Sequence, residues 1–123
     1  MVRFKNRYIL VELRWREPAT VDPSLDSGKI LRALRNQISN DFGDWGLGAV
    51  SQSLQVKYFN HQTNMCIIRC PRDHYQMVWS ALTLMTALNE RPLILASLHV
   101  AGTIRSCQKA AIQHDRKEVA QQS

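Results

Sequence analysis

The residues best suited to chemistry lie where a predicted strand over residues 93–100 gives way to Gly102-Thr103 and a basic helix. The N-terminus of a helix presents unpaired backbone N–H groups and a partial positive charge, so it can bind an anion such as a phosphate. Thr103 is a favourable N-cap residue, and Gly102 lets another backbone approach closely. The sequence therefore predicts a phosphate contact at this junction.

The helix that begins after Thr103 is expected to have one basic and one buried face. With about 100° per residue, Arg105, Lys109 and Arg116 fall within roughly 40° of one another. The opposite side carries Ile104, Cys107, Ala111 and His114. An ordinary amphipathic helix with solvated charges has the same pattern, so this segment alone leaves both interpretations open.

The overall charge favours a polyanionic partner. The chain has a formal net charge of +6 and a pI of about 9.7. Its eleven arginines outnumber its five lysines, and the planar guanidinium is the better phosphate ligand. Residues 1–16 carry Arg3, Lys5, Arg7, Arg14 and Arg16 against Glu12 alone. We therefore expect residues 1–6 to form a basic N-terminal arm that contacts RNA, with a solubilising tail as the alternative.

Length and cysteine usage indicate a single domain over residues 1–123 that folds without disulfides. Three cysteines without a Cys-x-x-Cys pair predict free, mostly buried thiols in a reducing compartment. Cys66, Cys70 and His74 are spaced by four, as helical metal ligands would be, but Pro71 and the strand-like residues before it argue against zinc. No apolar run approaches the roughly 20 residues that span a membrane, so no membrane partner is expected.

Four segments have the pattern of strands. They are residues 7–15, 53–58, 65–70 and 93–100. The middle two are joined by a hairpin connection over residues 60–64. In the first segment Ile9, Val11, Leu13 and Trp15 alternate with more polar residues, which predicts a half-buried strand.

Helical periodicity separates these strands. Ile30, Leu34 and Ile38 give the first helix its apolar stripe, with Ser24 or Asp26 as its cap, and the glycines at 43, 46 and 48 predict a loop after it. The second helix has an apolar face formed by Tyr75, Val78, Trp79, Leu82 and Met85, on which Tyr75 and Trp79 are expected to be core residues. A third, basic helix closes the chain and frays over residues 119–123.

The first six elements match the split βαβ arrangement, an RRM-like or ferredoxin-like α+β sandwich with an antiparallel four-stranded sheet and two helices on one face. Enzymes and metabolite sensors share this fold, so topology assigns no function. RNA readers of this fold stack bases on aromatic residues of the central strands, and residues 64–70 contain none. RNA binding is therefore expected to depend on phosphates and shape.

Several separated blocks resemble the small RRM-like protein subunit of eukaryotic ribonuclease P and ribonuclease MRP. The blocks are MVRFKNRY at 1–8, VKYFN at 56–60 with Thr63, RCPR at 69–72, Tyr75 with VWSALT at 78–83, and HVAGTIRSCQK at 99–109. The resemblance covers most of residues 1–114 and departs from the family around residues 17–28 and 43–49.

This resemblance implies a nuclear and nucleolar component of the ribonucleoprotein that removes the 5′ leader from precursor tRNA, and of its relative that processes ribosomal RNA precursors. In that family the RNA subunit holds Mg²⁺ and performs the hydrolysis. The implied partners are this catalytic RNA, precursor tRNA indirectly, a TIM-barrel-like protein subunit and a second small subunit of similar fold. Leu10, on the more polar face of the first strand beside Tyr8, predicts an exposed apolar patch for a protein partner.

The candidate RNA-binding residues are Arg3, Lys5, Arg7, Lys57, Arg69, Arg72, Gly102, Thr103, Arg105, Lys109 and Arg116. No paired carboxylates, Ser/His/Asp set or phosphate-binding glycine loop stands out, so we expect no catalytic residues and no metal on this chain. His99 and His114 are expected to be structural or exposed. The alternatives are an adaptor that binds only proteins and a small split-βαβ phosphate-ester hydrolase.

Overall fold

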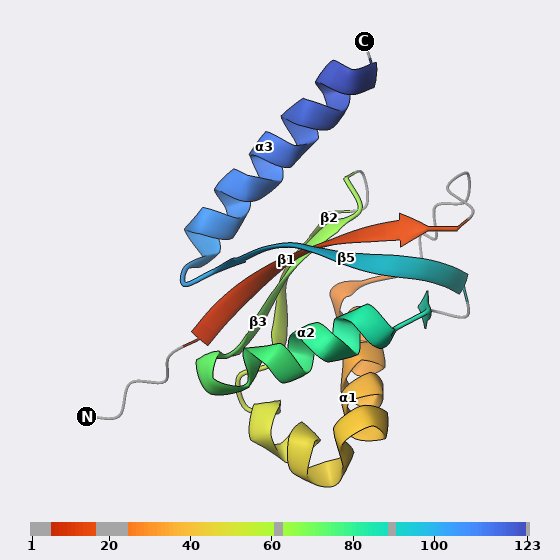
Figure 1. The fold of residues 1–123 in the computed structure, drawn as a ribbon, viewed down its shortest axis with the longest axis vertical. Helices are drawn as coiled ribbons and strands as arrows, with labels where there is room; N and C mark the ends of the chain where they lie inside the picture. The colour runs from red at the N-terminus through yellow and green to blue at the C-terminus, as the bar shows by residue number, and fades with distance from the viewer. Residues whose placement is uncertain (1–5, 17–24, 61–62, 89–90, 123) are drawn as a thin grey trace.

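A twisted antiparallel sheet of five strands, in the order β2-β3-β1-β5-β4, forms the centre of the computed structural model (Figure 1). The structure describes residues 6–16, 25–60, 63–88 and 91–122, with side chains to residue 114. Its elements are β1 (Asn6–Trp15), α1 (Ser27–Val50), β2 (Gln55–Asn60), β3 (Met65–Pro71), the 3-10 turn η1 (Arg72–His74), α2 (Tyr75–Leu84), β4 (Ala87–Leu88), β5 (Arg91–Ala101) and α3 (Ile104–Gln122). Helices α1 and α2 cover one face of the sheet, and α3 lies on the other. The predicted α+β split βαβ fold is confirmed.

The sheet has one strand more than predicted. The short strand β4 pairs with the beginning of β5, Ala87 opposite Pro92 and Leu88 opposite Arg91. A strand of two residues is too short to show a hydrophobic period, so only the tertiary structure reveals it.

Strand β1 is central and is buried on both faces. Ile9, Val11 and Leu13 pack into the core beneath α1 and α2, as predicted. Leu10 faces the other way, yet only 1% of it is exposed, because it packs with residues of α3 and neighbouring strands. The predicted exposed patch at Leu10 is therefore wrong. The alternating pattern of β1 predicts burial of one face only, so it does not indicate this second, smaller core.

The glycines after the first helix do not form the predicted loop. Asp26 caps α1, since its carboxylate accepts a hydrogen bond from the Lys29 amide at 2.8 Å. The helix then continues to Val50 across a kink at Gly43, whose φ of 70° is readily adopted only by glycine. A Cβ on Gly46 would lie 2.4 Å from Cβ of Phe42, so this buried position needs a residue without a side chain.

A β-bulge interrupts the predicted alternation of β2. The pairing with β3 shifts between Val56 and Tyr58, leaving Lys57 without a partner in the register. Phe59 consequently packs against the core under α1 and α2, whereas Tyr58 does not contribute to this core and is 38% exposed. In α2, Tyr75 packs half-buried against the core as predicted. Trp79 is half-buried at a shallow surface hollow and is not among the core residues, so the expectation that it is a core residue is wrong.

The three cysteines are free and buried, as predicted. Burial raises the pKa of Cys66 and of Cys70 to about 12 and that of Cys107 to about 11, so all three are neutral thiols near pH 7. Among the described residues, no group of three His, Cys, Asp or Glu side chains could hold a metal ion. No helix in the described part of the chain is long and apolar enough to cross a membrane.

Candidate nucleic-acid interface

Thr103 caps α3 as the sequence predicts. Its Oγ1 accepts a hydrogen bond from the backbone N–H of Ser106 at 3.2 Å. Gly102 and Thr103 are both exposed, so the start of the helix faces solvent. The positive end of the helix dipole is therefore accessible to an anion.

Arg7 lies beside this junction, although 95 positions separate it from Gly102 in the sequence. Tyr8 of β1 pairs with Ala101 of β5, which brings the start of one strand to the end of the other. A Cβ built on Gly102 would lie 3.6 Å from Nη1 of Arg7. The structure thus adds a guanidinium to the N-terminus of α3.

The two faces of α3 are arranged as predicted over its described side chains. Cys107 is buried against the sheet, and its Sγ donates a hydrogen bond to the carbonyl oxygen of Tyr8 at 3.2 Å. Arg105 and Lys109 are exposed on the other side. The side chain of Arg116 lies outside the described residues. Packing of the apolar face fixes the direction in which the basic face points.

The remaining candidates differ in how close they lie to the junction. Arg72 follows β3 at the same end of the sheet, because Pro71 pairs with Asn6, and it is exposed. Arg69 is half-buried, and its Nε donates a hydrogen bond to the carbonyl of Ser53 at 2.9 Å, which ties β3 to the segment before β2. Lys57 is exposed at the bulge of the outer strand β2.

Arg3 and Lys5 lie outside the described residues, so the predicted N-terminal arm stays a prediction. Of the candidates that the structure does describe, Arg7, Arg72 and Arg105 lie at the same end of the sheet as Gly102 and Thr103, and Nε of Arg72 is 3.7 Å from a carboxylate oxygen of Asp73. We call this group, with Lys109 one turn further along α3, the basic end.

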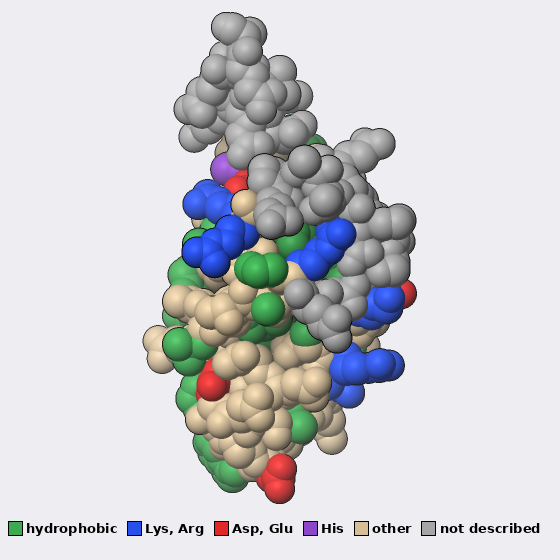
Figure 2. Space-filling model, turned by 90° about the vertical axis from the view of Figure 1, so that its right-hand side faces the viewer, with side chains coloured by type: hydrophobic (Ala, Val, Ile, Leu, Met, Phe, Trp, Pro, Cys, Tyr) green, Lys and Arg blue, Asp and Glu red, His purple; other side chains and the backbone are tan. Residues whose placement is uncertain are grey.

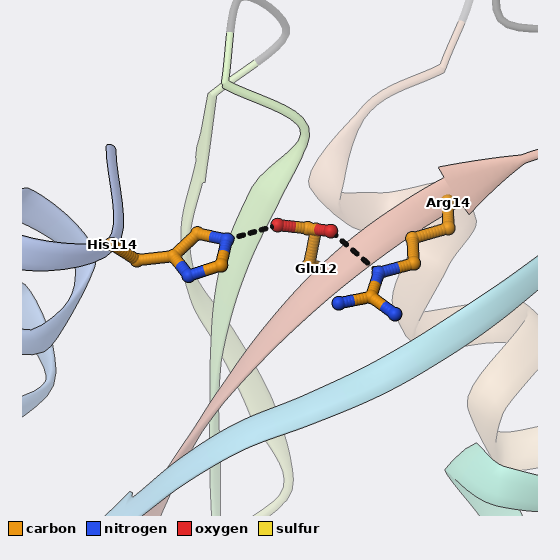
Figure 3. Close-up of polar contacts among 3 residues, drawn as sticks. All are labelled: Glu12, Arg14 and His114. Carbon is orange, nitrogen blue, oxygen red and sulfur yellow. Dashed lines mark hydrogen bonds and ion pairs between the residues drawn. The ribbon is translucent and has the colours of Figure 1, made fainter. Parts of the chain in front are cut away.

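The structure also reveals a polar cluster that was not among the predicted sites. Glu12 is only 8% exposed, and its carboxylate lies between β1 and α3 (Figure 3). One oxygen is 2.6 Å from Nε of Arg14, and the other is 2.5 Å from Nε2 of His114. Burial acts to raise the pKa of Glu12, but the hydrogen bonds from Arg14 and His114 outweigh it and leave that pKa below its usual value.

This cluster fastens α3 to the sheet, and it explains the position of His114 on the inner face of the helix. A carboxylate buried at this depth needs partners, and here they come from two elements. A lone glutamate in the middle of an apolar strand was the available signal. It indicates a buried charge pair, but not that the partner lies 102 residues away.

The sheet order and the two helices on one face define an RRM-like α+β domain, and the basic end gives that domain an accessible, positively charged surface. The family model described as the Rpp14/Pop5 family matches residues 7–112. The chain belongs to this family, and the resemblance noted in the sequence is confirmed.

Similar proteins carry the name ribonuclease P/MRP protein subunit POP5. The mouse protein is 42% identical over 123 residues, which cover 97% of this chain and 72% of that protein. The Schizosaccharomyces pombe protein is 35% identical over 127 residues, covering 97% and 91%. A chain in the cryo-EM structure of yeast ribonuclease MRP has the same fold, with a TM-score of 0.62 over 98% of each chain and 11% identity.

Proposed function

We propose that this chain is a non-catalytic protein subunit of ribonuclease P and of ribonuclease MRP, and that it binds and stabilises their catalytic RNA. The observation that carries the proposal is the similarity, over 97% of the chain, to relatives named as subunits of these complexes. The basic end supplies a physical role that fits such a subunit. Removal of the 5′ leader from precursor tRNA and processing of ribosomal RNA precursors are the reactions to which it contributes.

The basic end holds phosphates of the folded RNA in this proposal. The capped N-terminus of α3 offers backbone N–H groups, and Arg105 and Lys109 add charge on the exposed face of the same helix. Arg7 and Arg72 widen the surface, and Arg3 and Lys5 extend it. Affinity should therefore fall steeply as salt rises.

The contribution to the reaction is electrostatic. Folding an RNA brings its phosphates together, and cationic side chains placed among them reduce their mutual repulsion. The RNA then needs less Mg²⁺ to reach its active shape. The Mg²⁺ is held by the RNA, which performs phosphodiester hydrolysis, and this chain supplies no acid or base.

The proposed protein partners are a TIM-barrel-like subunit and a second small subunit of similar fold, in a particle located in the nucleus and nucleolus. Exposed apolar side chains on the side of α1 and α2 support contact with proteins there. Trp45 is 72% exposed and Leu84 is 56% exposed. These residues replace Leu10 as candidates for a protein contact.

Sequencing the RNA that co-purifies with a tagged full-length chain tests the proposal. We expect the RNA subunits of ribonuclease P and ribonuclease MRP to be strongly enriched. Proteins without RNA would instead support an adaptor. Cleavage of a phosphate ester or of precursor tRNA by the purified, RNA-free chain would support a hydrolase and overturn the proposal.

A further inference from the structure

The β-bulge in β2 places an aromatic side chain on the same side of the sheet as α3. Tyr58 pairs with Ile67 of β3, whose side chain lies in the small core under α3. Directly opposed residues of two paired strands share one face of the sheet, so Tyr58 lies on this face as well. Without the extra residue Lys57, alternation from the inward-facing Val56 would direct Tyr58 into the core under α1 and α2. Bulges occur often beside functional sites, because they redirect a side chain in this way.

Helix α3 closes the centre of this face but leaves its outer strand accessible. The helix contacts β5 through Ser106, whose Oγ is 3.5 Å from Nε2 of His99, and it contacts β1 through Cys107. At the centre of the face, Leu10 of β1 is 1% exposed and Ile67 of β3 is 0% exposed. Strand β2 lies at the edge of the sheet beyond β3, and Tyr58 is 38% exposed. The central strands on which RNA readers of this fold stack bases are therefore covered, whereas β2 can be reached from solvent.

The side chains near Tyr58 carry positive charge. Arg69 lies on the same face, since it is two residues from Ile67 along β3, and it is a diagonal neighbour of Tyr58. Its Nε donates to the carbonyl of Ser53, which holds the guanidinium at the edge of the sheet. Lys57 is exposed and precedes Tyr58 in the chain. Neither β2 nor β3 contains an Asp or Glu, so no carboxylate of these strands offsets the two charges.

Asn60 restrains the ring of Tyr58. Nδ2 of Asn60 donates a hydrogen bond to Oη of Tyr58 at 3.0 Å. Asn60 pairs with Met65, which belongs to the core under α3, so both side chains lie on one face. A ring that is held before binding loses less conformational entropy when a base stacks on it.

We propose that this surface, formed by Lys57, Tyr58, Asn60 and Arg69, binds an unpaired nucleotide of a single-stranded RNA segment that runs along β2. The base stacks on Tyr58, and the neighbouring phosphates lie on Lys57 and Arg69. Cations beside an accessible aromatic ring are the arrangement to which single-stranded nucleic acids bind. The assignment rests on the proposed function and extends it, because the basic end holds folded RNA by its phosphates whereas this surface takes an unpaired base.

A photoreactive RNA tests the contact on the unaltered protein. A short oligouridylate that contains 4-thiouridine is irradiated together with the full-length chain, and mass spectrometry identifies the residue to which it becomes attached. We expect attachment at Tyr58 or at its neighbours in β2. Attachment only at other elements would overturn the proposal.

Substitution of Tyr58 separates stacking from general attraction. Tyr58→Ala should weaken oligouridylate binding about tenfold, because it removes one base–aromatic stack. Tyr58→Phe keeps the ring and should bind nearly as well as the unaltered chain, and binding of a duplex RNA of equal length should change in neither variant. The matched control is Trp45→Ala, which removes an exposed aromatic side chain from α1. Equal weakening by Tyr58→Ala and Trp45→Ala, or none by either, would contradict a specific site.

Lys57→Ala tests the charge beside the ring. Lys and Arg side chains also lie at several separate places elsewhere on the surface, as Figure 2 shows for one side of the molecule. The matched control is therefore Arg32→Ala, which removes an exposed charge from α1. We expect Lys57→Ala to reduce the salt slope of oligouridylate binding by about 0.7, which corresponds to one phosphate contact. The same reduction in Arg32→Ala would contradict a contact at Lys57.

A photocrosslinking amino acid in place of Tyr58 identifies what covers this surface in the assembled particle. We expect crosslinks to RNA, and crosslinks to protein alone would show that a partner subunit lies there and would overturn the proposal. If the catalytic RNA co-purifies with the chain but no RNA is attached at β2, the proposed function stands and this surface is not an RNA site. If no ribonuclease RNA co-purifies, the proposed function fails, whatever the oligouridylate shows.

Discussion

The two faces of the sheet are built differently. The face under α1 and α2 is closed by a large core of buried hydrophobic side chains. The face under α3 has a small core around Leu10 and Ile67, a buried carboxylate at Glu12, and exposed residues such as Ile94. Stability therefore depends chiefly on the first face, and the basic end, which is proposed to bind RNA, lies at the start of α3 beside the second.

This difference shows how a small fold can be stable and still expose charged side chains. A sheet that is closed on both faces would leave few places for charged side chains near its strands. Here α3 covers only part of its face, so that charges remain accessible at both ends of β1. The helix itself is fastened by Cys107 and by the contact of His114 with Glu12.

Neighbouring isoleucines of β3 provide the sharpest test of the comparison. Ile68 points into the core under α1 and α2, and Ile67 into the core under α3, with 0% of each exposed. We expect Ile68→Ala to lower the free energy of unfolding by about 4 kcal/mol and Ile67→Ala by about 2 kcal/mol, because the smaller core can collapse by movement of α3. Urea denaturation measures both, and equal losses would contradict the comparison.

The Glu12 cluster predicts a dependence on acid pH. Because the pKa of Glu12 is lowered in the folded protein, its carboxylate stabilises the fold above the unfolded-state pKa, and this contribution disappears as the pH falls through the folded-state pKa. We expect Glu12→Gln to cost about 1 to 2 kcal/mol at pH 7 and less at pH 3, where the carboxylate becomes protonated. Urea denaturation across this range measures the difference. A difference that is the same at both pH values would contradict the account.

Thr103 predicts a smaller effect. Thr103→Ala removes the oxygen that accepts the Ser106 N–H, and it should lower the free energy of unfolding by about 1 kcal/mol. Thr103→Ser keeps that oxygen and is the matched control, with a loss of at most a few tenths of a kcal/mol. Thermal denaturation followed by circular dichroism distinguishes the two, and identical curves would show that the cap contributes nothing.

The features that could be predicted from the sequence are those with local causes. The cap at Thr103 and the two faces of α3 follow from residues within a few turns of one another. The order of the main elements follows from periodicity, and with it the split βαβ topology. The burial of Cys107 follows from its place on the apolar side of α3.

The features that could not be predicted depend on which residues meet in space. Because of the bulge at Lys57, Phe59 faces the core in place of Tyr58, and this bulge is seen only in the pairing of β2 with β3. The burial of Leu10 requires α3 to cross its face of the sheet. Arg7 joins Gly102 only because β1 and β5 are paired in one register.

The most direct test of the central claim is precursor-tRNA cleavage by particles assembled with the Arg105→Ala, Lys109→Ala chain. These side chains are exposed, so the variant should fold normally. If the basic end holds phosphates of the catalytic RNA, the particle will need more Mg²⁺ and will lose activity at lower salt than one carrying Arg32→Ala with Arg35→Ala. Unchanged Mg²⁺ and salt dependence would contradict the account.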